Sequence, residues 1–120
     1  MNANKRTNPD FLNGVPELLI LKLLAHKPMY GYELVQRIKL QSHAVFEFGE
    51  GCIYPILHRL ERDRLLTSRR AEVGGRSRVV YRVTPAGLRK LEETVSAWRR
   101  IVEAVARVLQ GGTDVAPSPA

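Results

Sequence analysis

The sequence predicts a mainly α-helical α+β fold, in which three short helices precede a two-stranded β-hairpin and one long helix. Three observations support this prediction. Apolar residues recur at helical spacing between residues 16 and 64, and β-branched residues flank a Gly-Gly pair between residues 65 and 83. A heptad pattern follows up to residue 109. The length of 120 residues fits one domain, and an apolar fraction of 44% is enough for one core.

The first two helices are predicted on either side of Pro28. The first begins near Pro16, a residue that suits the first helical turn, and runs to about Lys27. Its apolar residues cover more than one face, so we expect it to contact a partner subunit as well as its own core. The second helix follows a turn at residues 29–31 and runs to about Gln41.

The third predicted helix runs from Gly51 to Arg64, after a loop in which Phe46 and Phe48 point inward. At about 100° per residue, one face is apolar and should face the core, with Ile53, Ile56, Leu57 and Leu60. The opposite face offers small, aromatic and cationic side chains, as a helix that reads DNA bases in the major groove would. The alternative is an ordinary solvated face with Tyr54 half-buried. The candidate DNA contacts on this helix are Gly51, Tyr54, Pro55, His58, Arg59 and Arg62.

The hairpin is predicted from strand-like runs at residues 65–71 and 79–83, joined by a turn at Gly74-Gly75. Thr84 should cap the last helix, with Pro85 in its first position. Together with the three helices, this hairpin makes a winged helix-turn-helix. The predicted organisation is a flexible arm (1–14), a winged helix-turn-helix domain (15–84), a dimerisation helix (85–110) and a disordered tail (111–120).

The charge distribution favours an anionic partner, above all nucleic acid. The net charge is +7 and the pI is about 10.1. Residues 59–90 hold ten basic and three acidic residues, whereas the remainder holds nine of each. The hairpin tip is a candidate phosphate contact through Arg76, Ser77 and Arg78, although a solubilising loop is the alternative. Further cations that could join this basic strip are Arg69, Arg70 and Arg82, and Lys5 and Arg6 belong either to it or to a disordered basic end.

The last helix carries a heptad seam that predicts a homodimer. About 25 residues make a helix of roughly 37 Å, which a winged helix-turn-helix domain of this size cannot cover. Monomers rarely expose so long an apolar stripe. A two-fold dimer would place two reading helices about 34 Å apart on a near-palindromic site. Trp98 in mid-seam is either interface packing or a platform for a flat apolar effector. The predicted interface comprises Leu88, Leu91, Val95, Trp98, Val102, Val105 and Leu109, widened by Ile101 and Val108, together with Leu21 and Leu24 of the first helix.

Other classes of function find little support in the sequence. The most apolar run is seven residues long and contains Lys22, so no membrane span is expected, and the polar N-terminus lacks a signal peptide. We therefore expect a soluble cytoplasmic protein. Cys52 alone forms no disulfide within the chain; it is either a redox-sensitive thiol or a small half-buried residue. No nucleotide-binding loop, hydrolase motif or zinc spacing is found, so no enzymatic activity, metal or cofactor is expected.

Five stretches of the chain match a known family: 17–24, 28–33, 51–61, 75–81 and 83–87. The closest match is Gly51-Cys52-Ile53-Tyr54-Pro55-Ile56-Leu57-His58-Arg59-Leu60-Glu61. Through these stretches the chain resembles the PadR-like family of bacterial transcriptional regulators. The similarity covers about residues 15–100, and the single helix after the wing resembles the small subfamily.

The resemblance implies a dimeric winged-helix repressor that pairs through its last helix. Some family members release DNA on binding a small aromatic or drug-like effector, for which Trp98 is a candidate contact here. DNA contact carries over to residues 51–62, Cys52 included, and to the wing tip at 76–78. Cys52 departs from the family, which usually has Ser or Thr at this position.

Two alternatives to a DNA-binding repressor remain open at this stage. The basic strip could dock an acidic protein, in which case the chain would be an interaction module with no preference among DNA duplexes. RNA is a weaker alternative, because no cluster of exposed aromatic residues suited to stacking bases is evident.

Overall fold

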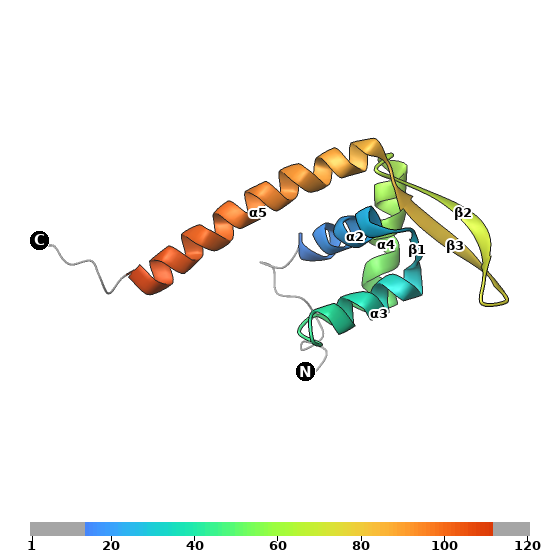
Figure 1. Cartoon of the computed structure of the whole chain (residues 1–120), viewed down its shortest axis with the longest axis horizontal. Coiled ribbons are helices and arrows are strands. Elements are labelled where there is room, and N and C mark those ends of the chain that lie inside the picture. Colours follow the sequence, from blue (N-terminus) through green and yellow to red (C-terminus); the bar gives the residue numbers. More distant parts are fainter. Residues whose placement is uncertain (1–13, 112–120) are drawn as a thin grey trace, which may run out of the picture.

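The structure, a computed structural model, describes residues 14–111. Within them, four helices and one three-stranded antiparallel sheet confirm the predicted α+β winged helix-turn-helix with its long last helix (Figure 1). The predicted arm before Gly14, with Lys5 and Arg6, and the predicted tail after Gly111 lie outside the described residues. The elements are α2 (Val15–His26), β1 (Met29–Tyr30), α3 (Gly31–Gln41), α4 (Glu50–Arg62), β2 (Leu66–Val73), β3 (Arg76–Val83) and α5 (Pro85–Gly111).

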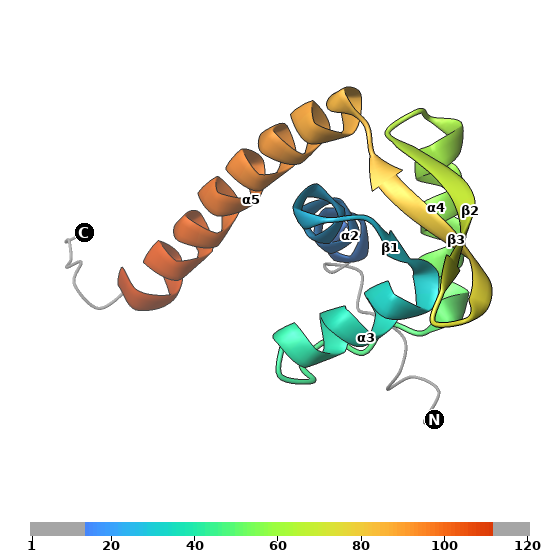
Figure 2. The same ribbon diagram turned by 45° about the vertical axis from the view of Figure 1, so that its right-hand side comes forward.

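Helix α2 lies at the centre of the fold, with α3, α4, β3 and α5 around it (Figure 2). This position explains why its apolar residues cover several faces: Ile20 and Leu21 are fully enclosed, and Leu24 is 3% exposed. These side chains lie in the core of their own chain. The expectation that Leu21 and Leu24 face a partner subunit is therefore corrected, since the chain itself already covers them.

The sheet has the strand order β1-β3-β2. The β2–β3 ladder continues to the pair Val73–Arg76, so both strands are longer than predicted and only Gly74 and Gly75 form the turn. Both glycines have positive φ (60° and 79°), as a two-residue hairpin turn requires. Residues 29–30, predicted as part of a turn, instead form the short strand β1, which pairs with residues 80–81 of β3.

Helix α4 packs with its predicted apolar face against the core. Ile53, Leu57 and Leu60 are fully buried, and Ile56 is half-buried. The helix begins at Glu50 and ends at Arg62, two residues before the predicted end, because Arg64 adopts a left-handed φ of 64°. In the loop before α4, the buried Phe48 stacks on the half-buried Phe46, with 5.5 Å between ring centroids.

The first turn of α5 is held against the base of the hairpin. The Thr84 hydroxyl accepts a hydrogen bond from the Gly87 amide (3.0 Å), which confirms the predicted cap, and the same hydroxyl donates to the Arg64 carbonyl oxygen (2.9 Å). A Cβ at Gly87 would overlap the Leu65 carbonyl oxygen, so only glycine allows this close approach. From this anchor α5 runs about 40 Å, well past the end of α2 (Figure 1). Over residues 14–111, every helix is too short or too polar to cross a membrane.

Candidate nucleic-acid interface

One side of α4 presents a contiguous solvent-exposed face. Gly51, Pro55, His58 and Arg62 are all exposed, and their spacing of four, three and four residues places them in one row along the helix. The row begins with small residues near the start of α4 and ends with an imidazole and a guanidinium. The structure thus brings together four of the predicted DNA-contacting residues.

Two other predicted contacts on α4 have structural partners within the chain. The half-buried Tyr54 ring lies against Gly31 at the start of α3, where a Cβ would overlap the ring, so Tyr54 sets the approach of α3 to α4. Its ring centroid is 6.3 Å from that of His58. Half-burial of Tyr54 agrees with the alternative considered for this face. Cys52 is also half-buried and packs against the core.

Arg59 links α4 to the first turn of α2. Its Nη2 donates to Glu17 Oε1 at 3.0 Å, and the two side chains are 44% and 22% exposed. The ion pair orients a guanidinium that would otherwise be free to reach a phosphate. Sequence reasoning missed Glu17, because a pair between residues 42 positions apart leaves no local signal.

The predicted DNA contacts at the wing tip also differ in whether they are exposed or packed against another element. Arg76 and Ser77 are exposed, and Ser77 Oγ accepts a hydrogen bond from Arg70 Nη1 at 3.4 Å. Arg78 is half-buried, with its guanidinium carbon 4.2 Å from the centroid of the Tyr30 ring, a cation–π contact. Arg76 is therefore the freer of the two tip arginines, whereas Arg78 packs against β1.

A partly buried polar cluster joins α4 to the sheet. Ser68 Oγ donates to Glu61 Oε2 at 2.8 Å, and the neighbouring Tyr81 is 3% exposed. Burial raises the pKa of the Tyr81 hydroxyl, with further contributions from the charge of Glu61 and from Tyr54. Tyr81 thus stays neutral near pH 7, and the cluster fixes the position of the hairpin relative to α4.

The predicted dimer seam on α5 falls into two parts. Leu91 is buried and Val95 packs against the core, so both contact their own chain. Beyond them the apolar side chains are exposed: Trp98 by 37%, Val102 by 48%, Val105 by 51% and Leu109 by 78%. Leu88 (43%), Ile101 (53%) and Val108 (77%) are exposed as well. The described part of the chain leaves this second half of α5 without a cover.

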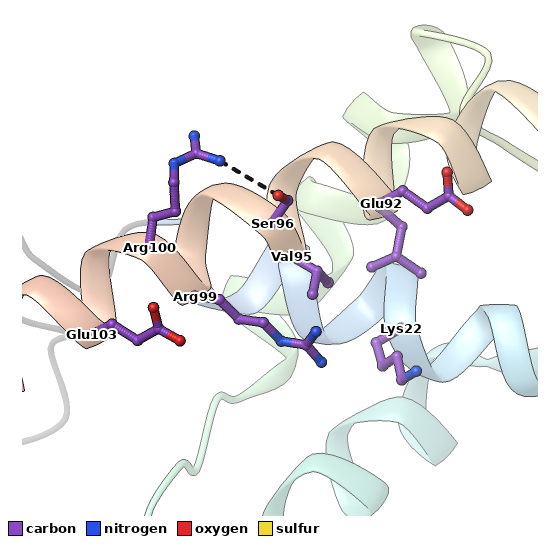
Figure 3. Close-up of a pocket in the computed structure, with 8 residues that line it drawn as sticks. Lys22, Glu92, Val95, Ser96, Arg99, Arg100 and Glu103 are labelled. Carbon is purple, nitrogen blue, oxygen red and sulfur yellow. Dashed lines mark hydrogen bonds between the residues drawn. The ribbon is translucent and has the colours of Figure 1, made fainter.

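An open cleft of about 460 Å³ separates α5 from α2. Leu91 and Val95 form its apolar part, and charged side chains together with Ser96 form the rest. Figure 3 shows Arg99 on the side of α5 that faces Lys22 of α2, whereas Arg100 reaches back to Ser96, whose Oγ it approaches at 3.4 Å. Trp98 does not line this cleft. Residues 14–111 also contain no cluster of His, Cys, Asp or Glu that could hold a metal ion.

Comparison with known proteins places these features in a family. Residues 20–93 match the transcriptional regulator PadR-like family. Transcriptional regulator Rv3488 of Mycobacterium tuberculosis is 40% identical over 103 residues, which cover 86% of this chain and 90% of that protein.

Two solved structures show the same similarity in three dimensions. A PadR-like transcriptional regulator from Bacillus cereus has a TM-score of 0.75 at 31% identity, over 85% of this chain and 98% of that one. A PadR family transcriptional regulator from Eggerthella lenta has a TM-score of 0.72 at 31% identity, over 83% and 86% of the two chains. All three relatives are described as regulators of transcription.

Proposed function

Since the chain belongs to the PadR-like family of transcriptional regulators, and is not an enzyme, we propose that it is a cytoplasmic, sequence-specific repressor that binds DNA as a homodimer. The observation that carries this proposal is the exposed row on α4, beside a wing whose tip is basic. The dimer would bind a near-palindromic operator, because two copies related by a two-fold axis present two such rows.

In this proposal the residues of α4 and those of the wing contact different parts of the DNA. His58 and Arg62 point from α4 toward base edges and phosphates in the major groove, and Gly51, Cys52 and Pro55 let the start of the helix approach the backbone. Arg76 and Ser77 contact the backbone beside the groove. Two of the remaining predicted contacts, Tyr54 and Arg59, act mainly by holding α4 in place, since each packs against or pairs with another helix. Arg78 is oriented by its packing on Tyr30 of β1.

The dimer proposal is supported by the exposed half of α5. Its large apolar side chains lie on a helix that projects from the rest of the chain, and a second copy of α5 packed against it would remove them from water. Leu91 and Val95 already pack against the core of their own chain. The contact between copies would therefore centre on Trp98, Val102 and Val105 and extend to Leu109.

We propose in addition that a small aromatic or drug-like effector binds at Trp98 between the two copies and releases DNA. Trp98 is 37% exposed and lies where α5 leaves the rest of the fold. A ligand there would contact the helix that sets the distance between the two α4 rows. It would shift DNA affinity only if it bound the free dimer more tightly than the DNA-bound dimer.

Selection of bound duplexes from a random DNA pool tests the main proposal. The expected result is a motif with two inverted half-sites whose centres lie about 10 base pairs, or one helical turn, apart. His58→Ala and Arg62→Ala should change the selected half-site or weaken binding to it, whereas Arg89→Ala on the first turns of α5 serves as a charge control. Binding without any enriched motif would contradict the proposal and favour an acidic protein as the partner.

The effector proposal is tested on the same operator complex. The fluorescence of Trp98, the single tryptophan, reports binding in a screen of aromatic compounds. A compound that changes the emission should lower operator affinity. Trp98→Leu, which also removes the fluorophore, should abolish the effect of the compound on operator affinity. Compounds that change the emission and leave DNA affinity unaltered would contradict release by an effector at this site.

A further inference from the structure

The strand register separates the arginines of the hairpin onto two faces of the sheet. Paired residues share a face and successive residues alternate. Leu66 and Tyr81 are buried, and Ser68 binds Glu61 of α4, so the face that holds them is the inner one. Arg70 shares the inner face. The opposite, outer face carries Arg69, Arg76, Arg78 and Arg82.

The outer face contains no compensating negative charge within the hairpin. Glu72 is the only carboxylate between residues 66 and 83, and its pairing with Ser77 places it on the inner face. None of the four outer-face arginines forms an ion pair with any residue between 14 and 111. The outer face therefore concentrates four positive charges that the described chain leaves unneutralised.

These arginines form a row along the wing rather than a compact cluster. Arg76 at the tip and Arg82 at the base are six residues apart on β3, which corresponds to about 20 Å. Arg69 lies opposite Val80, between Arg78 and Arg82. Arg78 is held on the Tyr30 ring at 4.2 Å, so the middle of the row is preorganised. A linear array of this kind matches the regular phosphates of a DNA backbone better than a patch on a folded protein.

We propose that the outer face of the sheet binds the phosphate backbone of DNA that flanks the operator, on the side of the wing away from α4. This inference rests on the proposed DNA-binding function, because the row begins at Arg76, where the wing tip is proposed to meet the duplex. The backbone that passes the tip continues along Arg78, Arg69 and Arg82 if the flanking DNA bends toward the sheet. The protein would thus bind a longer stretch of DNA than α4 and the tip alone can cover.

The test compares two duplexes that share one selected operator. The short duplex ends at the outer edge of the half-sites, and the long one continues by about 15 base pairs on each side, roughly one and a half helical turns. Wild-type protein should bind the long duplex about tenfold more tightly. Arg69→Thr combined with Arg82→Thr should remove this gain and leave affinity for the short duplex unchanged, since both side chains are exposed and far from the tip.

Two further measurements separate a specific contact from a general loss of charge. Loss of two phosphate contacts should reduce the slope of log affinity against log salt by about 1.8 on the long duplex only. The charge-matched control, Arg89→Gln with Lys90→Gln on α5, should keep the full preference for the long duplex. Thermal melting of both double variants verifies that the fold is intact.

The outcomes distinguish this inference from the function on which it rests. Equal wild-type affinity for the two duplexes, equal loss on both duplexes in the Arg69→Thr/Arg82→Thr variant, or the same loss in the control would overturn the flanking contact and leave operator binding intact. An unaltered preference in the Arg69→Thr/Arg82→Thr variant would overturn it too, and would leave the row free for an acidic protein. Failure of wild-type protein to prefer the operator over a scrambled duplex would instead overturn the proposed function.

Discussion

The head of the molecule (residues 15–84) encloses most of its large apolar side chains, with Leu40 and Val45 as the most exposed exceptions. The second half of α5 (residues 98–111), the rod, leaves its large apolar side chains in water. Ile53 and Leu57 in the head are fully buried, but Val108 and Leu109 in the rod are 77% and 78% exposed. The two regions use the same types of side chain. They differ in whether other residues of the same chain bury the apolar side chains.

This difference teaches that stability and assembly are separate properties here. The head has the contacts it needs to fold within one chain. The rod gains its contacts from a second copy in the proposed dimer, so its side chains should affect association much more than the unfolding of the head. Matched substitutions in the two regions can test this separation.

The largest expected effect comes from Leu57→Ala in the head. The substitution leaves a cavity at a fully buried position, and we expect the free energy of unfolding to fall by about 2–5 kcal/mol. The matched substitution Leu109→Ala in the rod should change it by less than about 0.5 kcal/mol, because the side chain is exposed in the single chain. Urea unfolding, at a protein concentration that dissociates the dimer, measures both. Similar losses for the two variants would contradict the separation.

The next effect concerns assembly. Val105→Glu places two carboxylates in the proposed seam, one from each copy, and should weaken dimerisation about 100-fold or more. Sedimentation at micromolar concentration measures the change, and circular dichroism should show an unchanged head. Arg107→Gln is a control on the same turn that keeps the apolar seam. A Val105→Glu variant that remains dimeric would mean that the copies associate elsewhere or that the seam lies on another face.

A smaller effect is expected within the head at the ion pair between Glu17 and Arg59. Glu17→Gln should lower the free energy of unfolding by at most about 1 kcal/mol, since the pair is partly exposed. It should also free Arg59 to reach a phosphate and steepen the salt dependence of operator binding by about 0.9. Lys39→Gln, which breaks the pair between Lys39 in the last turn of α3 and Glu47 in the loop before α4, is the control. An unchanged salt slope would show that Arg59 serves α2–α4 packing alone.

The smallest effect is a pH dependence confined to the head, which holds all four tyrosines. Burial raises the pKa of Tyr81 above its ordinary value of 10.0, so the unfolded chain loses this proton at lower pH than the folded chain. The contribution of the Tyr81 hydroxyl to the free energy of unfolding is fully present below pH 10 and is lost as the pH rises through the pKa of the folded state. Tyr81→Phe should therefore lose less stability than wild type as the pH is raised above 10. Parallel curves for the two proteins would contradict this assignment.

Local patterns were sufficient to predict much of the fold. The apolar face of α4, the Gly74-Gly75 turn and the Thr84 cap each depend on residues a few positions apart. Strand β1 could not be predicted in this way, since two residues show no periodicity and their partners are 50 or more positions away in the sequence. Alternation along the predicted strand already places Arg69 and Arg70 on opposite faces, but only the observed register shows that Arg69 shares the outer face with Arg82.

The candidate site was predicted less completely than the fold. The sequence placed Gly51, His58 and Arg62 correctly on one exposed face, since helical spacing is enough for that conclusion. It did not predict that Arg59 pairs with Glu17 or that Arg78 packs on Tyr30, because these contacts depend on tertiary packing. The prediction of the dimer seam was also incomplete. The heptad pattern continues unbroken from Leu91 to Leu109, although Leu91 and Val95 pack against the core of their own chain.

The pairing of Met29 with Tyr81 has a consequence for the order in which the chain matures during synthesis. The two residues are separated by 52 positions, so β1 remains without a partner until the whole hairpin has been translated. Helices α3 and α4 depend on nearby residues and can form earlier. The apolar half of α5 leaves the ribosome after all of these. A nascent chain therefore exposes the apolar second half of α5 only once every residue of its sheet has been translated. This order limits association between incompletely folded copies on neighbouring ribosomes.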